Sequence, residues 1–154
     1  DYRDKLLPAA IENAYTFNLA TYYYHIGEFR EVLELLLTVE YTDIRYALGS
    51  RTLLVQTYYR LEEETSFLSM LASFRQYVKR NKTISEFRKD GYYNFLRFTR
   101  RAFNIKTGID YESGEKIERD LNRLLANISE DKTFFYKSWL LTETEKLSQL
   151  LERA

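Results

Sequence analysis

The feature that most constrains the fold of this chain is an internal repeat. Shifting the sequence by 35 residues lays residues 19–36 on residues 54–71, and each matching position keeps its apolar or aromatic character. The matching pairs are Leu19 and Leu54, Tyr23 and Tyr58, Tyr24 and Tyr59, Ile26 and Leu61, Val32 and Phe67, Leu33 and Leu68, and Leu36 and Leu71. A further shift of 41 residues gives a looser third match and brings Asn18 onto Asn94. Such a repeat predicts small units that are stable only when stacked.

Apolar residues recur at intervals of three and four along the whole chain, which is the period of an amphipathic helix. One proline and five glycines leave few points at which a helix must stop. We therefore predict an all-α fold. The expected helices are 8–26, opened by Pro8; 29–41; 43–61; 64–80; 83–103, capped by Thr83 and Glu86; 115–126; and 130–154. Residues 1–7 are expected to be the tail of an earlier helix, and residues 104–114 the longest loop.

The pattern predicts which side chains lie inside. The expected core includes Leu19, Tyr23, Leu36, Leu54, Tyr58, Leu71, Phe74 and Trp139. The first helix carries one apolar stripe made of Ile11, Tyr15, Leu19, Tyr22, Tyr23 and Ile26. Asn18 and Asn94 occupy equivalent positions, where a buried amide tying neighbouring helices together is one interpretation. Gly49 and Gly91 lie inside predicted helices, where either a close approach of another helix or a wrong helix boundary would explain them.

Composition excludes several classes of protein. Lys plus Arg equals Asp plus Glu at 23 each, so no overall charge draws the chain to nucleic acid or to a membrane surface. The absence of cysteine excludes a disulfide scaffold, a zinc–thiolate site and a cysteine nucleophile. The first residue is Asp rather than Met, so we expect a fragment of a longer protein. A leader sequence that had been removed would not appear in this sequence. The expected location is the cytoplasm.

The repeat resembles the tetratricopeptide repeat, a unit of two helices with a period near 34 residues. The residues that carry the resemblance are Asn18-Leu19-Ala20, Tyr23, Gly27-Glu28-Phe29, Val32, Leu36 and Val39. Ala20, Val32 and Val39 depart from the family pattern, the closing proline is missing, and the second unit has Glu62 in place of the turn glycine. The chain also resembles uncharacterised bacterial proteins whose last helix carries a Trp-Leu-Leu sequence, here Trp139-Leu140-Leu141.

The resemblance implies a single domain, an α–α superhelix with units at 8–41, 43–81 and 83–128 and a closing helix at 130–154. It also implies a concave groove lined by the first helix of each unit. Tyr23 would pack on the second helix of its own unit, and Tyr24, about 100° further round, would face the groove. The groove-facing positions would be Thr21, Tyr24, His25, Gln56, Tyr59, Arg60, Arg97, Arg100 and Arg101.

A groove that changes from aromatic to basic along its length would suit a protein interaction or scaffolding role. Tyrosines provide rigid contact area and arginines bind carboxylates, so we expect a protein or peptide partner of acidic character. Tyr24 and Tyr59 would be the anchors, and Arg97 and Arg100 the charge clamp. Truncating Tyr59 is then expected to weaken binding and leave stability nearly unchanged. The simpler interpretation is a solvated helix face on a purely structural segment.

A second hypothesis concerns the basic run at 75–106. Its positive residues are Arg75, Lys79, Arg80, Lys82, Arg88, Lys89, Arg97, Arg100, Arg101 and Lys106, interleaved with Tyr92, Tyr93, Phe95 and Phe98. Such a mixture can bind single-stranded nucleic acid through phosphate contacts and base stacking. Phe95 and Phe98, however, have the spacing of core residues and are expected to be buried.

Little in the sequence favours catalysis. His25 is the only histidine, and Glu28 offers it only a thin metal-binding geometry. No glycine-rich phosphate loop or nucleophile elbow is present. We therefore expect a protein that is not an enzyme and that uses neither cofactor nor metal.

Overall fold

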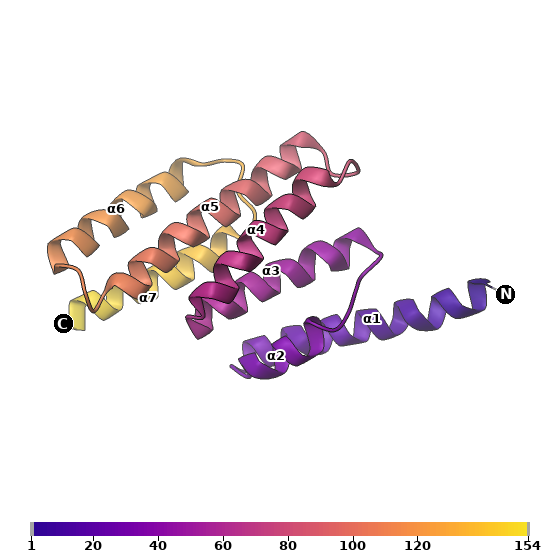
Figure 1. Ribbon diagram of the computed structural model, residues 1–154. Coiled ribbons are helices and arrows are strands. Elements are labelled where there is room, and N and C mark those ends of the chain that lie inside the picture. The colour runs from indigo at the N-terminus through magenta and orange to yellow at the C-terminus, as the bar shows by residue number, and fades with distance from the viewer. Residues whose placement is uncertain (1, 154) are drawn as a thin grey trace. The chain divides into compact units, whose positions relative to one another are not determined.

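The computed structural model describes the backbone of residues 2–153 and the side chains of residues 8–153. Within that range the chain has seven helices and no strand, which confirms the all-α prediction (Figure 1). The helices are α1 (Tyr2–His25), α2 (Phe29–Leu36), α3 (Ile44–Leu61), α4 (Glu64–Arg80), α5 (Glu86–Gly108), α6 (Gly114–Glu130) and α7 (Lys137–Arg153). Two compact units, Asp1–Met70 and Leu71–Ala154, divide the chain inside α4 rather than at any of the predicted repeat boundaries.

The turn between α1 and α2 is closed by a left-handed residue. Gly27 has a φ of +82°, and its N–H donates to the carbonyl oxygen of Tyr24 at 3.1 Å. The N–H of Glu28 donates to the carbonyl oxygen of Tyr23 at 2.8 Å. These two bonds form a Schellman motif, which satisfies the last carbonyls of α1 and reverses the chain.

The turn between α3 and α4 repeats this geometry 35 residues later. Glu62 has a φ of 56° and donates to Tyr59, and Glu63 donates to Tyr58, each at 3.3 Å. The α1–α2 turn and the α3–α4 turn therefore have the same backbone geometry, as the internal repeat predicts. A glutamate does in the second turn what glycine does in the first, at the cost of the steric strain that a Cβ meets in this conformation.

Replacing Glu62 with Gly is expected to raise the free energy of unfolding by about 1 kcal/mol, because glycine adopts the left-handed conformation without strain. Gly27→Ala makes the opposite change in the first turn, since it adds a Cβ to a residue in the left-handed conformation. A Cβ at Gly27 meets no atom within 4 Å, so its effect comes from the backbone alone and is expected to be a loss of about 1–2 kcal/mol. Urea unfolding of both variants measures the two effects. Equal stability of Glu62→Gly and wild type would show that the turn is unstrained.

The first unit packs its helices through aromatic contacts. Phe17 of α1 meets the ring of Tyr46 of α3 edge-on at 5.5 Å between centroids, and the ring of Tyr41 at 6.5 Å. Gly49 permits this approach, because a Cβ there would lie 2.9 Å from the tip of Phe17. The prediction that α2 reaches residue 41 is wrong. Its helix ends at Leu36, and the following segment places Tyr41 against Phe17 and Tyr46.

The tyrosines that face the second helix of each hairpin are Tyr24 and Tyr59. The Tyr24 ring lies 5.5 Å from Phe29, the first residue of α2, and the Tyr59 ring lies 6.4 Å from Phe67 of α4. The inward face of each first helix, which packs on its partner helix, is thus centred on Tyr24 and Tyr59, one residue later than the predicted Tyr23 and Tyr58. Leu36, Leu54, Tyr58, Leu71 and Phe74 are buried as predicted, whereas Leu19, Tyr23 and Trp139 are only half-buried.

Two further predictions about α1 are wrong. The helix does not begin at Pro8, because a continuous helix runs from Tyr2 through that proline to His25. Most of the predicted apolar stripe also faces solvent, since Ile11, Tyr15, Tyr22 and Ile26 are exposed. The side of α1 that faces the other helices instead carries Phe17, Ala20 and Tyr24.

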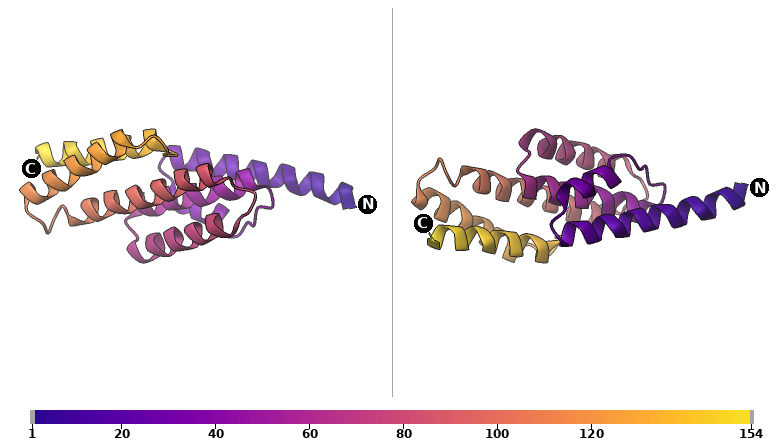
Figure 2. Two further views of the ribbon diagram at one scale, coloured as in Figure 1. Left: turned by 90° about the horizontal axis from the view of Figure 1, so that it is seen from above. Right: turned by 90° about the horizontal axis from the view of Figure 1, so that it is seen from below.

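In the second unit, α5, α6 and α7 run alongside one another (Figures 1 and 2). The N-cap of α5 is Ser85, which accepts from the N–H of Arg88, whereas the predicted cap Thr83 donates to the side chain of Asn81. The helix also continues past Phe103 to Gly108, because buried Ile105 extends its inner face. The predicted loop at 104–114 is correspondingly short, and Ser113 caps α6.

Residues 131–136 connect α6 to α7 without a helix, although they were predicted to begin the last helix. Phe135 from this loop packs on Gly91 of α5, where a Cβ would come within 2.7 Å of the ring. The N–H of Phe135 donates to the carbonyl oxygen of Gly91 at 3.4 Å. The close approach of another helix predicted for both glycines is confirmed at Gly49, whereas at Gly91 the approaching residue comes from a loop.

Candidate functional site

The structure removes three of the predicted groove residues from any accessible surface. Tyr59 is fully buried, and Tyr24 and Gln56 are nearly so. The physical reason is the one-residue offset of the inward face, which turns both tyrosines toward the second helix of their hairpins. The prediction that Tyr24 and Tyr59 anchor a partner is therefore wrong.

The other predicted residues of the first unit lie at its surface or edge. The Thr21 hydroxyl donates to the carbonyl oxygen of Phe17 at 3.0 Å, so it serves the helix itself. His25 is exposed at the end of α1, with its ring edge-on to Tyr24 at 5.8 Å. The Arg60 guanidinium lies 5.2 Å from the centre of the Phe29 ring. These contacts assign Thr21 and Arg60 local structural roles.

The arginines of α5 have a different setting, because two of them border a groove in the second unit. Arg97 and Arg101 are four residues apart and thus share one face of the helix. Arg100 is exposed but lies about 100° round the helix from Arg101, and it does not line this groove. Of the two arginines predicted to form a charge clamp, Arg97 lines the groove and Arg100 does not, whereas Arg101 does.

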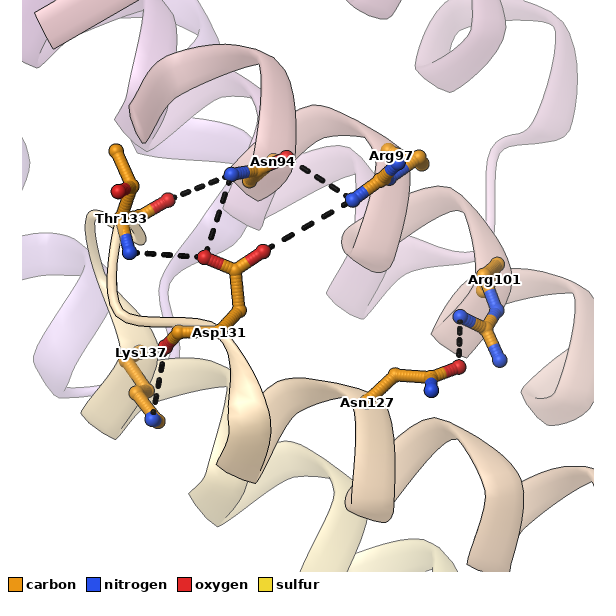
Figure 3. A network of polar contacts seen from close by, with 7 residues as sticks. All are labelled: Asn94, Arg97, Arg101, Asn127, Asp131, Thr133 and Lys137. Carbon is orange, nitrogen blue, oxygen red and sulfur yellow. Dashed lines mark hydrogen bonds and ion pairs between the residues drawn. The ribbon is translucent and has the colours of Figure 1, made fainter. Parts of the chain in front are cut away.

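One wall of the groove is a loop held by a network of polar contacts (Figure 3). The Asn94 side chain of α5 donates to the carbonyl oxygen of Thr133 at 2.7 Å and to Oδ1 of Asp131 at 3.4 Å. The same Asp131 oxygen accepts from the N–H of Thr133 at 2.8 Å, and Lys137 donates to the Asp131 carbonyl oxygen at 3.3 Å. Asn94 therefore ties α5 to the loop, as predicted, whereas Asn18 is exposed and makes no equivalent tie.

The two guanidiniums are held in place by an aromatic ring and by neighbouring amides. Arg97 lies 4.7 Å and Arg101 5.6 Å from the centre of the buried Phe98 ring, which itself stacks on Phe134. Arg97 donates to Oδ1 of Asn94 at 3.0 Å, and Arg101 donates to Oδ1 of Asn127 at 2.8 Å (Figure 3). Cation–π contacts and neutral acceptors orient both guanidiniums, and a carboxylate oxygen of Asp131 also lies near that of Arg97.

These residues surround an open groove of about 420 Å³ between α5, the end of α6 and the loop. It is lined by Arg97, Phe98, Arg101, Asn127, Glu130 and Asp131. A second hollow of about 390 Å³ continues along α5 and α6 on the other side of Arg101 and includes Lys116, Asp120 and Arg123. Arg101 belongs to both, so it is the central side chain of the α5–α6 surface.

Basic and acidic side chains in equal number line the two hollows around Arg101. Burial is the main reason that the pKa of its guanidinium lies below the usual value, and the charges of Arg97 and Arg123 lower it further while Asp120 opposes them. The nearest carboxylate to Arg97 is that of Asp131, at 3.9 Å, too long for a tight ion pair. Lys116 differs, because Glu112 at 3.5 Å and Asp120 at 3.4 Å balance its charge. Arg97 and Arg101 are therefore the two side chains of the groove that an anion would contact, with Glu130 and Asp131 beside them.

The aromatic residues of the basic run are mostly unavailable to a nucleic acid. Tyr92, Phe95 and Phe98 are buried, which confirms the prediction for the two phenylalanines. The Arg75 guanidinium covers the Tyr93 ring at 4.8 Å. Lys89 is buried as well and donates to the carbonyl oxygen of Lys79 at the end of α4. Of the rings in this run, Tyr92, Phe95 and Phe98 are thus closed to base stacking, whereas Phe87 is exposed.

Sequence reasoning missed several residues of the groove. Asn127, Glu130 and Asp131 come from the end of α6, where the Ser-Glu-Asp sequence was interpreted as the start of the last helix. Arg123 was not singled out either. No periodic pattern marks these residues, because they act through contacts with side chains 26 to 37 positions away.

Comparison with known proteins returned no match among family models, curated proteins or solved structures. Across residues 2–153, no helix has the length and apolar character that crossing a membrane requires. The side chains that the structure describes include no group of three His, Asp or Glu residues arranged to hold a metal ion. The groove geometry is thus the principal basis for a functional assignment.

Proposed function

We propose that this protein is a helical-repeat interaction module that binds an acidic segment of a protein partner at the α5–α6 groove. The observation that carries the proposal is the pair of oriented guanidiniums, Arg97 and Arg101, at the edge of an open groove. Arg presents a planar fork that fits carboxylates, and fixed donors lose little freedom on binding. The tetratricopeptide-like architecture is part of the proposal, and the equal turns at Gly27 and Glu62 support it.

The groove favours a peptide over a nucleic acid. Its only basic side chains are Arg97 and Arg101, and Glu130 and Asp131 lie beside them. A phosphate backbone would meet these carboxylates along its path, whereas a peptide can place single carboxylates at the two arginines. The burial of Tyr92, Phe95 and Phe98 removes three of the rings on which a single strand could stack.

The test is a titration of the intact chain with a fluorescein-labelled glutamate-rich peptide, followed by fluorescence anisotropy. Arg101→Ala is expected to weaken binding by about 1–3 kcal/mol, the usual contribution of hydrogen bonds to charged groups. Arg101→Lys is expected to bind the peptide more tightly than Arg101→Ala but less tightly than wild type, because lysine keeps the charge but loses the planar fork. A matched peptide with lysine in place of glutamate is expected not to bind.

Arg100→Ala is the control variant, since it removes the same charge from the neighbouring position of α5 without touching the groove. It is expected to bind like wild type. Equal losses for Arg100→Ala and Arg101→Ala would show nonspecific charge attraction and contradict the proposal. A single-stranded oligonucleotide that binds more tightly than the acidic peptide, with a steep dependence on salt, would assign the surface to nucleic acid instead.

A further inference from the structure

The outer face of α1 carries large apolar side chains that the first unit leaves uncovered. Ile11 is 63% exposed, Tyr15 66%, Tyr22 57% and Ile26, just after the helix, 51%. Their spacing of four, seven and four residues places them on one side of the helix. Single exposed apolar residues are ordinary, but a contiguous stripe of this size marks an interaction surface.

The equivalent face of α3, one repeat later, is largely covered. One repeat later, Tyr15 and Tyr22 correspond to Ser50 and Thr57 of α3, and both are buried. Two more positions on this side of α3 have identified partners from the preceding hairpin. Tyr46, equivalent to Ile11, packs on Phe17, and Arg60, equivalent to His25, packs on Phe29. The face that α3 buries is thus open on α1 and filled with larger apolar residues.

The stripe is self-complementary. The order Ile, Tyr, Tyr, Ile reads the same in both directions about a midpoint between Asn18 and Leu19. Between residues 11 and 26 the only carboxylate is Glu12 and the only basic side chain is His25, so two copies bring no like charges face to face. Exposed Asn18 lies beside the midpoint, where two amides can pair and fix the register of a helix pair.

We propose that two copies of this chain associate through α1, with the two helices antiparallel and related by a twofold axis near Asn18. Ile11 of one copy lies level with Ile26 of the other, and Tyr15 lies level with Tyr22. The two Asn18 amides meet at the axis and hydrogen bond to each other. This surface belongs to the first unit and is separate from the α5–α6 groove, so it stands independently of the proposed function.

The area of the stripe agrees with a weak but specific dimer. With about 200 Å² for a large side chain, the four exposed fractions amount to roughly 500 Å² in each copy and 1,000 Å² in the pair. Specific interfaces begin at about this size. The dimer is therefore expected to form reversibly at micromolar concentrations.

The first experiment measures the oligomeric state by sedimentation equilibrium over a range of protein concentrations. Wild type is expected to shift reversibly from monomer to dimer. Tyr22→Arg is expected to weaken the dimer by at least about tenfold, because it places a charge in the apolar stripe of each copy. Tyr111→Arg, at a tyrosine that is 88% exposed and lies outside α1, is the matched control and is expected to associate like wild type. A wild type that stays monomeric, or equal effects of both variants, would overturn the proposal.

The second experiment tests the antiparallel geometry and uses the absence of native cysteine. Asn18→Cys is expected to form a disulfide-linked dimer under mild oxidation, because the two copies of residue 18 meet at the axis. Ile11→Cys is expected to stay unlinked, since antiparallel helices separate its two copies by about 22 Å. Efficient linking through residue 11 rather than residue 18 would show a parallel pair and overturn the geometry.

Discussion

Replacing Tyr59 with Ala is expected to lower the free energy of unfolding by about 3–5 kcal/mol, the range for removing a fully buried aromatic ring. The Tyr59 side chain has no exposed surface, and its ring packs against Phe67 of α4. Removing it leaves a cavity between the two helices of the second hairpin. Chemical unfolding followed by circular dichroism measures the loss.

Tyr111→Ala is the control for this experiment, because it removes the same side chain from an exposed position. Its effect is expected to stay within about 0.5 kcal/mol. A Tyr59→Ala variant as stable as wild type would mean that the ring contributes little to the core. The residue would then again be available as the groove anchor that the sequence predicts.

Replacing Phe95 with Ala is expected to cost a similar amount, about 3–5 kcal/mol, in the second unit. The Phe95 ring is fully buried, 5.3 Å from the ring of Tyr136 and 6.1 Å from that of Trp139. Trp139 is the only tryptophan, so its fluorescence reports directly on this cluster. We expect its emission to shift to longer wavelength as water reaches the indole.

Phe87→Ala is the matched control, since Phe87 lies on the same helix with its ring exposed. It is expected to change neither the stability nor the tryptophan emission. If Phe95→Ala leaves both unchanged as well, Phe95 is not part of the core that holds the α6–α7 loop against α5.

The helices were predictable where local chemistry and packing agree. Asp43 caps α3 through its side chain, and α4 runs from Glu64 to Arg80 as the sequence indicates. Errors arose where tertiary contacts override the local signal. Thr83 has the sequence of a cap, but its hydroxyl bonds to Asn81 and Ser85 takes the role. Phe135 of the 131–136 loop lies four residues before Trp139, which is the spacing of helical core residues and suggested that the last helix includes it. The Phe135 ring packs on Gly91 instead, and the helix begins at Lys137.

The candidate site was harder to predict than the fold. An error of one residue in the position of the inward face rotates a helix by about 100°, which was enough to turn Tyr24 and Tyr59 from anchors into core residues. On α5 the pattern correctly singled out arginines, because charged side chains on a helix face are visible in sequence. It did not reveal Asn127 or Asp131, whose role depends on a contact between distant segments.

The central claim is that the surface around Arg97 and Arg101 binds acidic peptides. The most direct measurement compares amide NMR spectra of the intact chain with and without the glutamate-rich peptide. The account predicts shifts that cluster at α5 from Arg97 to Arg101 and at the end of α6 from Arg123 to Asp131, and that disappear in Arg101→Ala. Shifts confined to other helices, or none at a saturating peptide concentration, would contradict it.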